Sequence, residues 1–94
     1  MAKIVFDYAL AIRQAERLEE AARRMDRLVS ETENALGTVS AHWSGESAGG
    51  YQKKGRRLSE MTRQKAALLH REAREVRRIA EYMRQLELDN AGLH

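Results

Sequence analysis

A seven-residue repeat of apolar residues runs through the first half of this chain and limits the folds open to it. The first set of positions in the repeat holds Tyr8, Ala15, Ala22, Val29, Leu36 and Trp43. The second set, three residues later in each heptad, holds Ala11, Leu18, Met25, Thr32 and Val39. A strict repeat of this length keeps one narrow stripe of a helix against a neighbouring helix. The pattern predicts a first helix over about residues 7–42, capped by Asp7, that packs lengthwise against another.

The second half of the chain predicts a second long helix after a tight turn. Apolar residues recur at helical spacing from Tyr51 to Leu86, which indicates a helix over about residues 47–89. The interruption between the two helices is the segment 43–46, where Gly45 can adopt backbone conformations that other residues resist. Residues 90–94 are expected to form a frayed tail.

Composition agrees with an all-α fold. The chain of 94 residues has no proline and one phenylalanine, whereas β-sheet proteins need turn residues and aromatic strands. One domain of this size makes a barely sufficient core. Further apolar residues lie outside the heptad stripe, at Ile12, Ala21, Leu28 and Ala35. Because one neighbour cannot cover both sets, we expect an antiparallel helical hairpin that pairs into a four-helix bundle dimer.

The seam of the hairpin and of the dimer is expected to use the larger apolar residues of both helices. These are Leu18, Met25, Val29, Leu36, Val39, Leu58, Leu69, Val76, Ile79 and Met83. Gly37 interrupts the first helix and suggests a close approach of another backbone there. Gly55, with Lys65 and Glu72 at the margin of the second stripe, predicts looser packing in the second helix near the turn.

The chain lacks the residue patterns of common catalytic and metal sites. There is no cysteine, and His42, His70 and His94 are too far apart in sequence to form a metal-binding motif. The glycines after Trp43 lack the lysine and the spacing of a phosphate-binding loop. We therefore expect a protein that is not an enzyme, with no cofactor and no metal. The sequence contains no run of about 18 apolar residues, so we expect no membrane span.

Charge is unevenly distributed along the chain. The net charge is +3, and residues 44–94 carry eleven Lys or Arg against seven Asp or Glu. A basic stripe along a nucleic-acid backbone would use Arg71, Arg74 and Arg78. Acidic residues stand three positions before several arginines and neutralise part of the stripe, at Glu60, Glu75 and Glu81. The pattern disfavours nucleic-acid binding and leaves an acidic helical partner open.

The centre of the chain resembles the WXG family of type VII secretion. Trp43-Ser44-Gly45 stands between two helices of similar length, and Ala48 and Tyr51 follow it at the family's spacing. The resemblance implies a small helical hairpin that forms homodimers or heterodimers with a related hairpin. Such proteins stay in the cytoplasm until an ATPase-driven type VII system exports them, without a cleaved signal peptide, to the cell surface or the medium.

The resemblance leaves the role of individual residues open. Trp43 either fills the last layer of the core or forms a surface patch with the turn that a secretion component recognises, and the two are compatible. Family export signals place an acidic residue four positions after a tyrosine near the end of the second helix. Here Leu86 occupies that position after Tyr82, and Glu87 comes one residue later. Tyr82 and Glu87 form either a degenerate signal or ordinary bundle surface.

Three functions follow from these patterns. The first is a secretion substrate or adaptor that acts through dimerisation. The second is an export chaperone or partner of a larger secreted toxin. The third, which the charge pattern favours least, is a basic coiled coil that binds nucleic acid.

Overall fold

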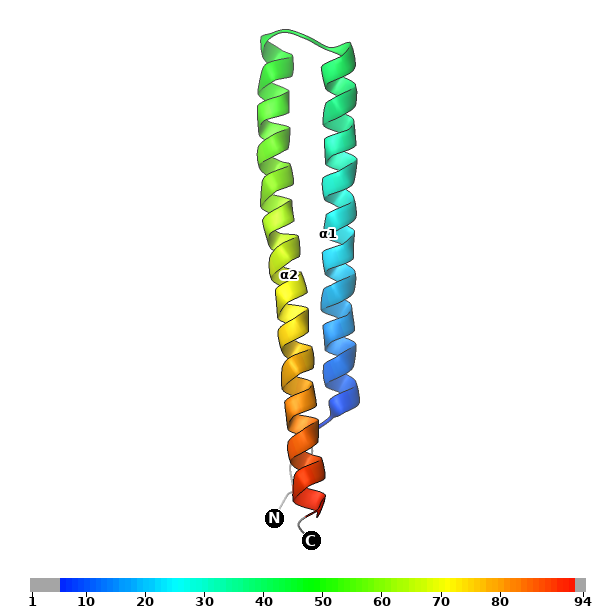
Figure 1. The fold of residues 1–94 in the computed structure, drawn as a ribbon. Coiled ribbons are helices and arrows are strands. Elements are labelled where there is room, and N and C mark those ends of the chain that lie inside the picture. The colour runs from blue at the N-terminus through cyan, green and yellow to red at the C-terminus, as the bar shows by residue number, and fades with distance from the viewer. Residues whose placement is uncertain (1–5, 93–94) are drawn as a thin grey trace.

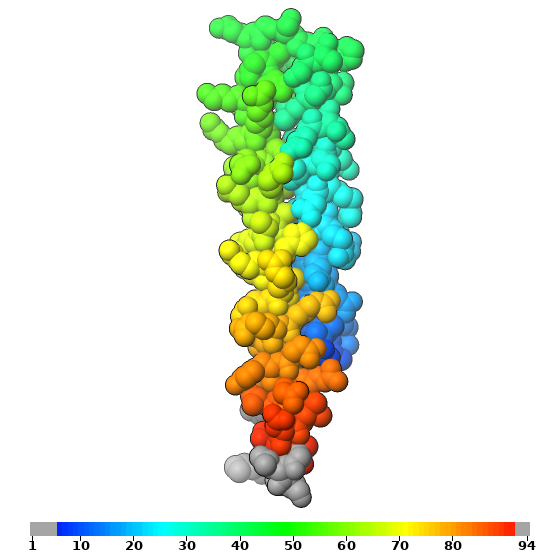
Figure 2. Space-filling view, viewed as in Figure 1, coloured from blue at the N-terminus to red at the C-terminus, as the bar shows by residue number. Residues whose placement is uncertain are grey.

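The computed structural model describes residues 6–92, which form two long antiparallel helices joined by a short turn (Figure 1). Helix α1 is Tyr8–His42 and helix α2 is Glu46–Gly92. The Cα atoms extend over 74 × 18 × 16 Å, so the molecule is a narrow rod, shown with its side chains in Figure 2. The prediction of an all-α helical hairpin is confirmed.

The ends of the helices at the turn and at Asp7 follow from local chemistry. The Asp7 carboxylate accepts a hydrogen bond of 3.0 Å from the Leu10 N–H, which confirms Asp7 as the N-cap of α1. At the other end of α1, Trp43 is extended, with φ −139° and ψ 132°. Gly45 then has φ +105°, a conformation that favours glycine, and its carbonyl accepts the first bond of α2 from the Gly49 N–H.

Helix α2 is longer than the sequence predicted at both ends. Glu46 was placed in the turn but is helical, because its carboxylate stands near the positive end of the helix dipole. The segment 90–92 was expected to fray but continues α2, and the Gln85 amide donates to the Asp89 carboxylate in the turns before it. The last two residues of the predicted tail lie outside the described residues.

Small side chains fill the seam between the two helices. The buried residues of α1 are Ala15, Ala22, Val29 and Leu36, and those of α2 include Ala48, Ser59, Ala66, Ala73 and Ala80. Apart from Ala48, the buried residues are seven apart in each helix, which is the spacing of a coiled coil. Alanine and serine allow the helix axes to come close, because the distance between packed helices depends on the side chains at the contact. The core is therefore thin, and the larger apolar side chains lie beside it.

Two of the residues predicted for the seam of the hairpin or of the dimer lie outside the contact between α1 and α2. Leu58 and Ile79 are 58% and 46% exposed and do not lie between α1 and α2, whereas their neighbours Ser59 and Ala80 are buried. At these two positions of α2 the close approach of the helices favours the smaller side chain of the neighbouring residue. Of the remaining predicted seam residues, Val29 and Leu36 are buried. The half-buried ones are Leu18, Met25, Val39, Leu69, Val76 and Met83.

The close approach occurs at Gly55 and not at Gly37. A Cβ atom at Gly55 would lie 3.2 Å from Leu36 Cγ and would overlap the end of that side chain. A Cβ atom at Gly37 would meet nothing within 4 Å, so α2 does not approach the backbone of α1 closely there. The absence of a side chain at Gly55 lets Leu36 pack directly on the backbone of α2.

Enlarging a seam alanine should destabilise the hairpin. Ala73 is 1% exposed, so Ala73→Leu would force the helices apart and should lower the free energy of unfolding by about 1–3 kcal/mol. The matched control is Ala67→Leu at an exposed position of the same helix, expected within about 0.5 kcal/mol of wild type. Urea denaturation followed by circular dichroism measures both. Equal stabilities of the two variants would contradict the small-residue seam.

Replacing glycine with alanine should change the free energy of unfolding in opposite directions in α1 and in the turn. Gly37→Ala removes a flexible residue from an open helical position and should raise the free energy of unfolding by about 1 kcal/mol. Gly45→Ala should lower it by about 1–2 kcal/mol, because φ there is +105°. Thermal and urea unfolding would measure the pair. A stabilising Gly45→Ala would refute the turn geometry.

Candidate functional site

One side of the hairpin carries a ladder of polar pairs between the helices. Its rungs are the ion pairs of Glu19 with Arg77 and of Glu33 with Arg63, and between them the hydrogen bond that joins Asp26 to His70. Glu19 Oε1 lies 2.7 Å from Arg77 Nη2, and Asp26 Oδ2 lies 2.9 Å from His70 Nε2. Successive rungs are seven residues apart in each helix, so they share one side of the coiled coil. We call this side the ion-pair edge.

The ion-pair edge continues to the start of α1. Arg84, seven residues after Arg77, stacks its guanidinium 4.9 Å from the centre of the Tyr8 ring, and the Tyr8 hydroxyl donates to the Glu81 carboxylate. The hydrogen bonds from Arg77 hold the pKa of Glu19 below its ordinary value. Those bonds also raise the pKa of Arg77, so both groups are charged at neutral pH. The edge therefore fixes the helices by charge where the core is thin.

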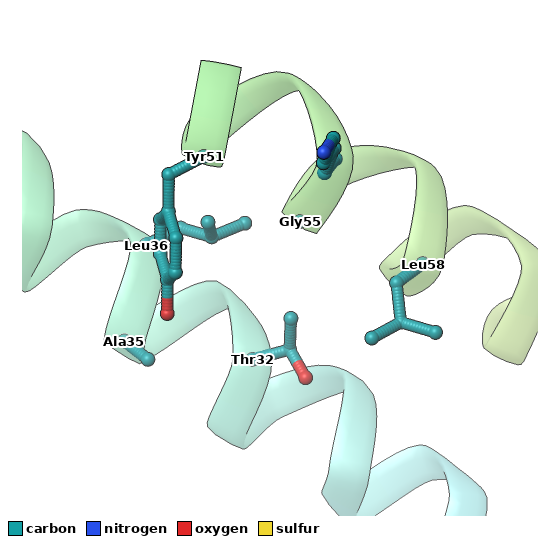
Figure 3. A pocket seen from close by; sticks show the side chains of 7 residues that line it. Thr32, Ala35, Leu36, Tyr51, Gly55 and Leu58 are labelled. Atoms are coloured by element: carbon teal, nitrogen blue, oxygen red, sulfur yellow. The ribbon is translucent and has the colours of Figure 1, made fainter. Parts of the chain in front are cut away.

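The opposite side of the hairpin is apolar and hollowed near the turn. A hollow of about 410 Å³ opens above Gly55 and Leu36, as Figure 3 shows. Its other lining residues are Thr32, Ala35, Tyr51, Lys54 and Leu58. The Tyr51 side chain reaches from α2 toward α1, beside Leu36. An apolar hollow of this kind suits the insertion of a side chain from another molecule.

The apolar side extends along the whole hairpin. Residues that are seven positions apart in one helix lie on the same side of a coiled coil and form a column. The columns that contain Thr32 and Ala35 in α1, and Gly55 and Leu58 in α2, therefore continue past the hollow. We call these four columns the apolar face. Its large exposed members are Leu28, Tyr51, Leu58, Ile79 and Leu86, between 38% and 58% exposed. Two exposed charged residues, Lys65 and Glu72, interrupt the column of Leu58. Exposed apolar side chains gathered on one face mark a site of interaction.

The turn motif presents its aromatic ring at the end of the rod. Trp43 is 47% exposed, and its ring centre lies 5.9 Å from that of Tyr51 at an angle of 56°. Ser44 and Gly45 are exposed beside it. The indole therefore packs on the Tyr51 ring and leaves about half of its surface exposed.

The residues of the possible export signal point in different directions. Tyr82 is 61% exposed. Glu87 accepts a hydrogen bond of 2.8 Å from the Phe6 N–H, at the start of the chain's described part. Five residues turn a helix by about 140° beyond one full turn, so the two side chains do not share a side of α2. The structure does not bring them together as one site.

The histidines and arginines singled out in the sequence lie in separate places. His70 belongs to the ion-pair edge, His42 is exposed at the end of α1, and His94 lies outside the described residues. Within residues 6–92 no three His, Cys, Asp or Glu side chains converge as a metal site. In the basic stripe, Arg78 Nε donates a hydrogen bond of 3.1 Å to Glu75 Oε2. Arg71 and Arg74 are exposed.

The ion-pair edge was not predicted from the sequence. Glu19 has a basic residue four positions later in its own helix, Arg23, but it binds Arg77 across the hairpin. The available signal was the seven-residue spacing of acids at 19, 26 and 33 against bases at 63, 70 and 77. Matching heptad columns of opposite charge on two antiparallel helices predict such a ladder.

The fold and its two unlike sides define a two-helix coiled-coil hairpin with one ion-paired edge and one uncovered apolar face. Comparisons of the chain with protein families, with curated proteins and with solved structures found no match. Neither helix, over the part that the structure describes, holds a stretch apolar enough and long enough to cross a bilayer.

The ion-pair edge should make stability depend on acid pH. The pKa of Glu19 is lower in the folded state than in the unfolded state. The contribution of Glu19 to the free energy of unfolding is therefore complete above the pKa of the unfolded state, and it is lost as the pH falls through the pKa of the folded state. Glu19→Gln should lower the free energy of unfolding at pH 7 and should make the loss below pH 5 shallower than in wild type. Glu31→Gln, an exposed acid of the same helix, is the control. Urea titrations at pH 7, 5 and 3 give the comparison, and an unchanged acid slope in Glu19→Gln would contradict this role.

Proposed function

We propose that this chain is a non-enzymatic substrate or adaptor of a type VII secretion system that acts by pairing with a second helical hairpin. One observation carries the proposal most directly. The Trp43-Ser44-Gly45 turn, with an indole that is 47% exposed, joins two long antiparallel helices whose apolar face is uncovered. This combination is what the resemblance to the WXG family implies.

The apolar face supports the pairing step. Two helices alone bury mainly small residues, and large side chains such as Leu28 and Leu58 remain more than half exposed. A second hairpin on this face would complete a four-helix bundle, the usual way in which amphipathic helices of this length cover wide apolar stripes. The partner is a second copy or a related hairpin.

The turn supports the recognition step. Trp43 and Tyr51 form an exposed aromatic pair at one end of the rod, away from the ion-pair edge rungs at Glu19 and Asp26. Exposed aromatic side chains provide large binding energy at little cost in conformational entropy. In this proposal, the secretion ATPase or another component of the export machinery reads the turn, and the chain passes from the cytoplasm to the exterior without cleavage of a leader.

The separation of Tyr82 from Glu87 favours a second candidate function. An export signal that requires both side chains on one side of α2 is not assembled here, because Glu87 binds the Phe6 N–H. A partner that carries its own signal would supply what this chain lacks. The alternative is therefore an export chaperone whose apolar face covers the helical region of a larger secreted toxin.

Loss of the indole should separate recognition from folding. Trp43→Ala, expressed in a bacterium with an active type VII system, should abolish export of the chain while its helical content and its oligomeric mass stay as in wild type. The ring lies at the end of the rod and is 47% exposed, so its removal leaves the seam intact. Quantification of the chain in culture medium and in cell lysate measures export.

The control for this variant is His42→Ala, which removes the neighbouring exposed ring and should export normally. Normal export of Trp43→Ala would refute the role of the turn. Export that requires co-expression of a larger toxin, with which the chain co-purifies, would favour the chaperone function over the substrate function.

A further inference from the structure

The ladder of the ion-pair edge stops one step before the turn. Its rung nearest the turn joins Glu33 to Arg63. Each step toward the turn moves seven residues along both helices, so the next step places Ser40 opposite Arg56. The helices still pack closely at Gly55, the residue before Arg56, so the same spacing holds at this level. In this fourth position the arginine is present, and a serine stands where the other rungs have a carboxylate.

The surface of α1 opposite Arg56 is small and open. Gly37 and Ser40 are three residues apart and share one side of α1, and both are exposed. A Cβ atom at Gly37 would meet nothing within 4 Å. A ligand can therefore reach the Arg56 guanidinium from the side of α1, and the Ser40 hydroxyl can donate a hydrogen bond to it.

Arg56 belongs to a group of four positive side chains, which we call the basic cluster. The other members are Lys53, Lys54 and Arg57, and all four are exposed. None of the four forms an ion pair with another of residues 6–92. Arg63, one heptad farther along the same column as Arg56, is paired with a carboxylate. The basic cluster therefore differs from the rest of its column.

Few acidic side chains of the hairpin lie near the basic cluster. Residues 34–57 contain one acid, Glu46, which precedes the cluster by seven positions, about 10 Å along the helix axis. Of the next acids, Glu33 pairs with Arg63, and Glu60 lies 4.0 Å from the same arginine. The basic cluster thus attracts anions from outside the hairpin, and added salt weakens this attraction.

The form of the cluster favours the carboxylates of a protein over the phosphates of a nucleic acid. In a filled rung of the same column, Arg77 Nη2 lies 2.7 Å from Glu19 Oε1. The cluster spans four helical steps, about 6 Å, and would meet about two phosphates of a strand, too few to hold its backbone. Tyr51, whose ring can stack on a base, is five residues from Arg56 and therefore about 140° around the helix.

We propose that the basic cluster binds an acidic segment of a partner protein, one carboxylate of which completes the fourth rung by pairing with Arg56 beside Ser40. The pair is a charge-assisted hydrogen bond of the kind found in the other arginine rungs. Lys53, Lys54 and Arg57 attract the segment and bind its neighbouring acids. Arg56 lies on the ion-pair edge and not on the apolar face, so the site does not depend on the pairing or the secretion role in the proposed function.

A carboxylate supplied by the chain itself tests the fourth rung. Ser40→Glu should occupy Arg56 and weaken the binding of a short labelled peptide of consecutive glutamates by about fivefold, measured by fluorescence anisotropy at low salt. The matched control is Thr38→Glu, which makes the same change of charge about 160° around the helix from Ser40 and should bind nearly as wild type. Ser40→Glu should also melt about 1–4 °C above Thr38→Glu, because only its carboxylate reaches Arg56.

Removal of the arginine tests the other half of the rung. Arg56→Gln should weaken binding of the same peptide by about fivefold, whereas Arg74→Gln, at another exposed arginine of α2, should have little effect. Circular dichroism verifies that each variant keeps its helical content. A labelled thymidine oligonucleotide is titrated against the same variants, and it should bind more weakly than the glutamate peptide.

Three results would overturn the inference. The first is no binding of the glutamate peptide at low salt. The second is equal weakening by Ser40→Glu and Thr38→Glu, which would reduce the attraction to net charge alone. The third is tighter binding of the oligonucleotide with a loss in Arg56→Gln, which would assign the cluster to phosphates. None of these results bears on the export of Trp43→Ala, which tests the proposed function separately.

Discussion

The close approach of two helices along a seam of alanine and serine determines the rest of this molecule. Because Ala22 and Ala73 are nearly inaccessible to solvent, no larger side chain can enter the seam without separating the helices. Apart from Val29 and Leu36, the larger apolar side chains therefore lie beside the seam and not in it. The hairpin therefore gains little buried apolar area from its own fold. The ion-pair edge adds polar contacts between the helices, and the apolar face stays uncovered.

The ion-pair edge alone does not fix how the two helices align. Its charges repeat every seven residues, so a shift by one heptad would still place Glu19 opposite a basic residue, His70 or Arg84. The fit of Leu36 against Gly55 is not repeated, because the residues seven positions from Gly55 are Ala48 and Thr62. The alignment is therefore set by one close contact and by the length of the turn, and the charges stabilise it.

The sequence predicted α1 better than α2, for a physical reason. In α1 the heptad positions carry the apolar residues, so the repeat alone identifies the buried stripe. In α2 the largest apolar residues, such as Leu58 and Ile79, stand next to smaller ones that are buried. Hydrophobicity favours the larger residue, and only the short distance to α1 selects Ser59 and Ala80. The ladder across the hairpin was missed for a similar reason, because Glu19 also had a possible partner within its own helix.

The thin seam connects stability to assembly. A chain of 94 residues is close to the size at which a single core is barely sufficient, and here the core holds mostly alanine. Any partner that binds the apolar face of the folded hairpin, and not the unfolded chain, adds its binding free energy to folding. The alanines that bring α1 and α2 together are thus also the reason that Leu58 and Ile79 remain available to another molecule. Replacing them with larger residues would alter the fold and the apolar face together, so one set of small side chains controls both.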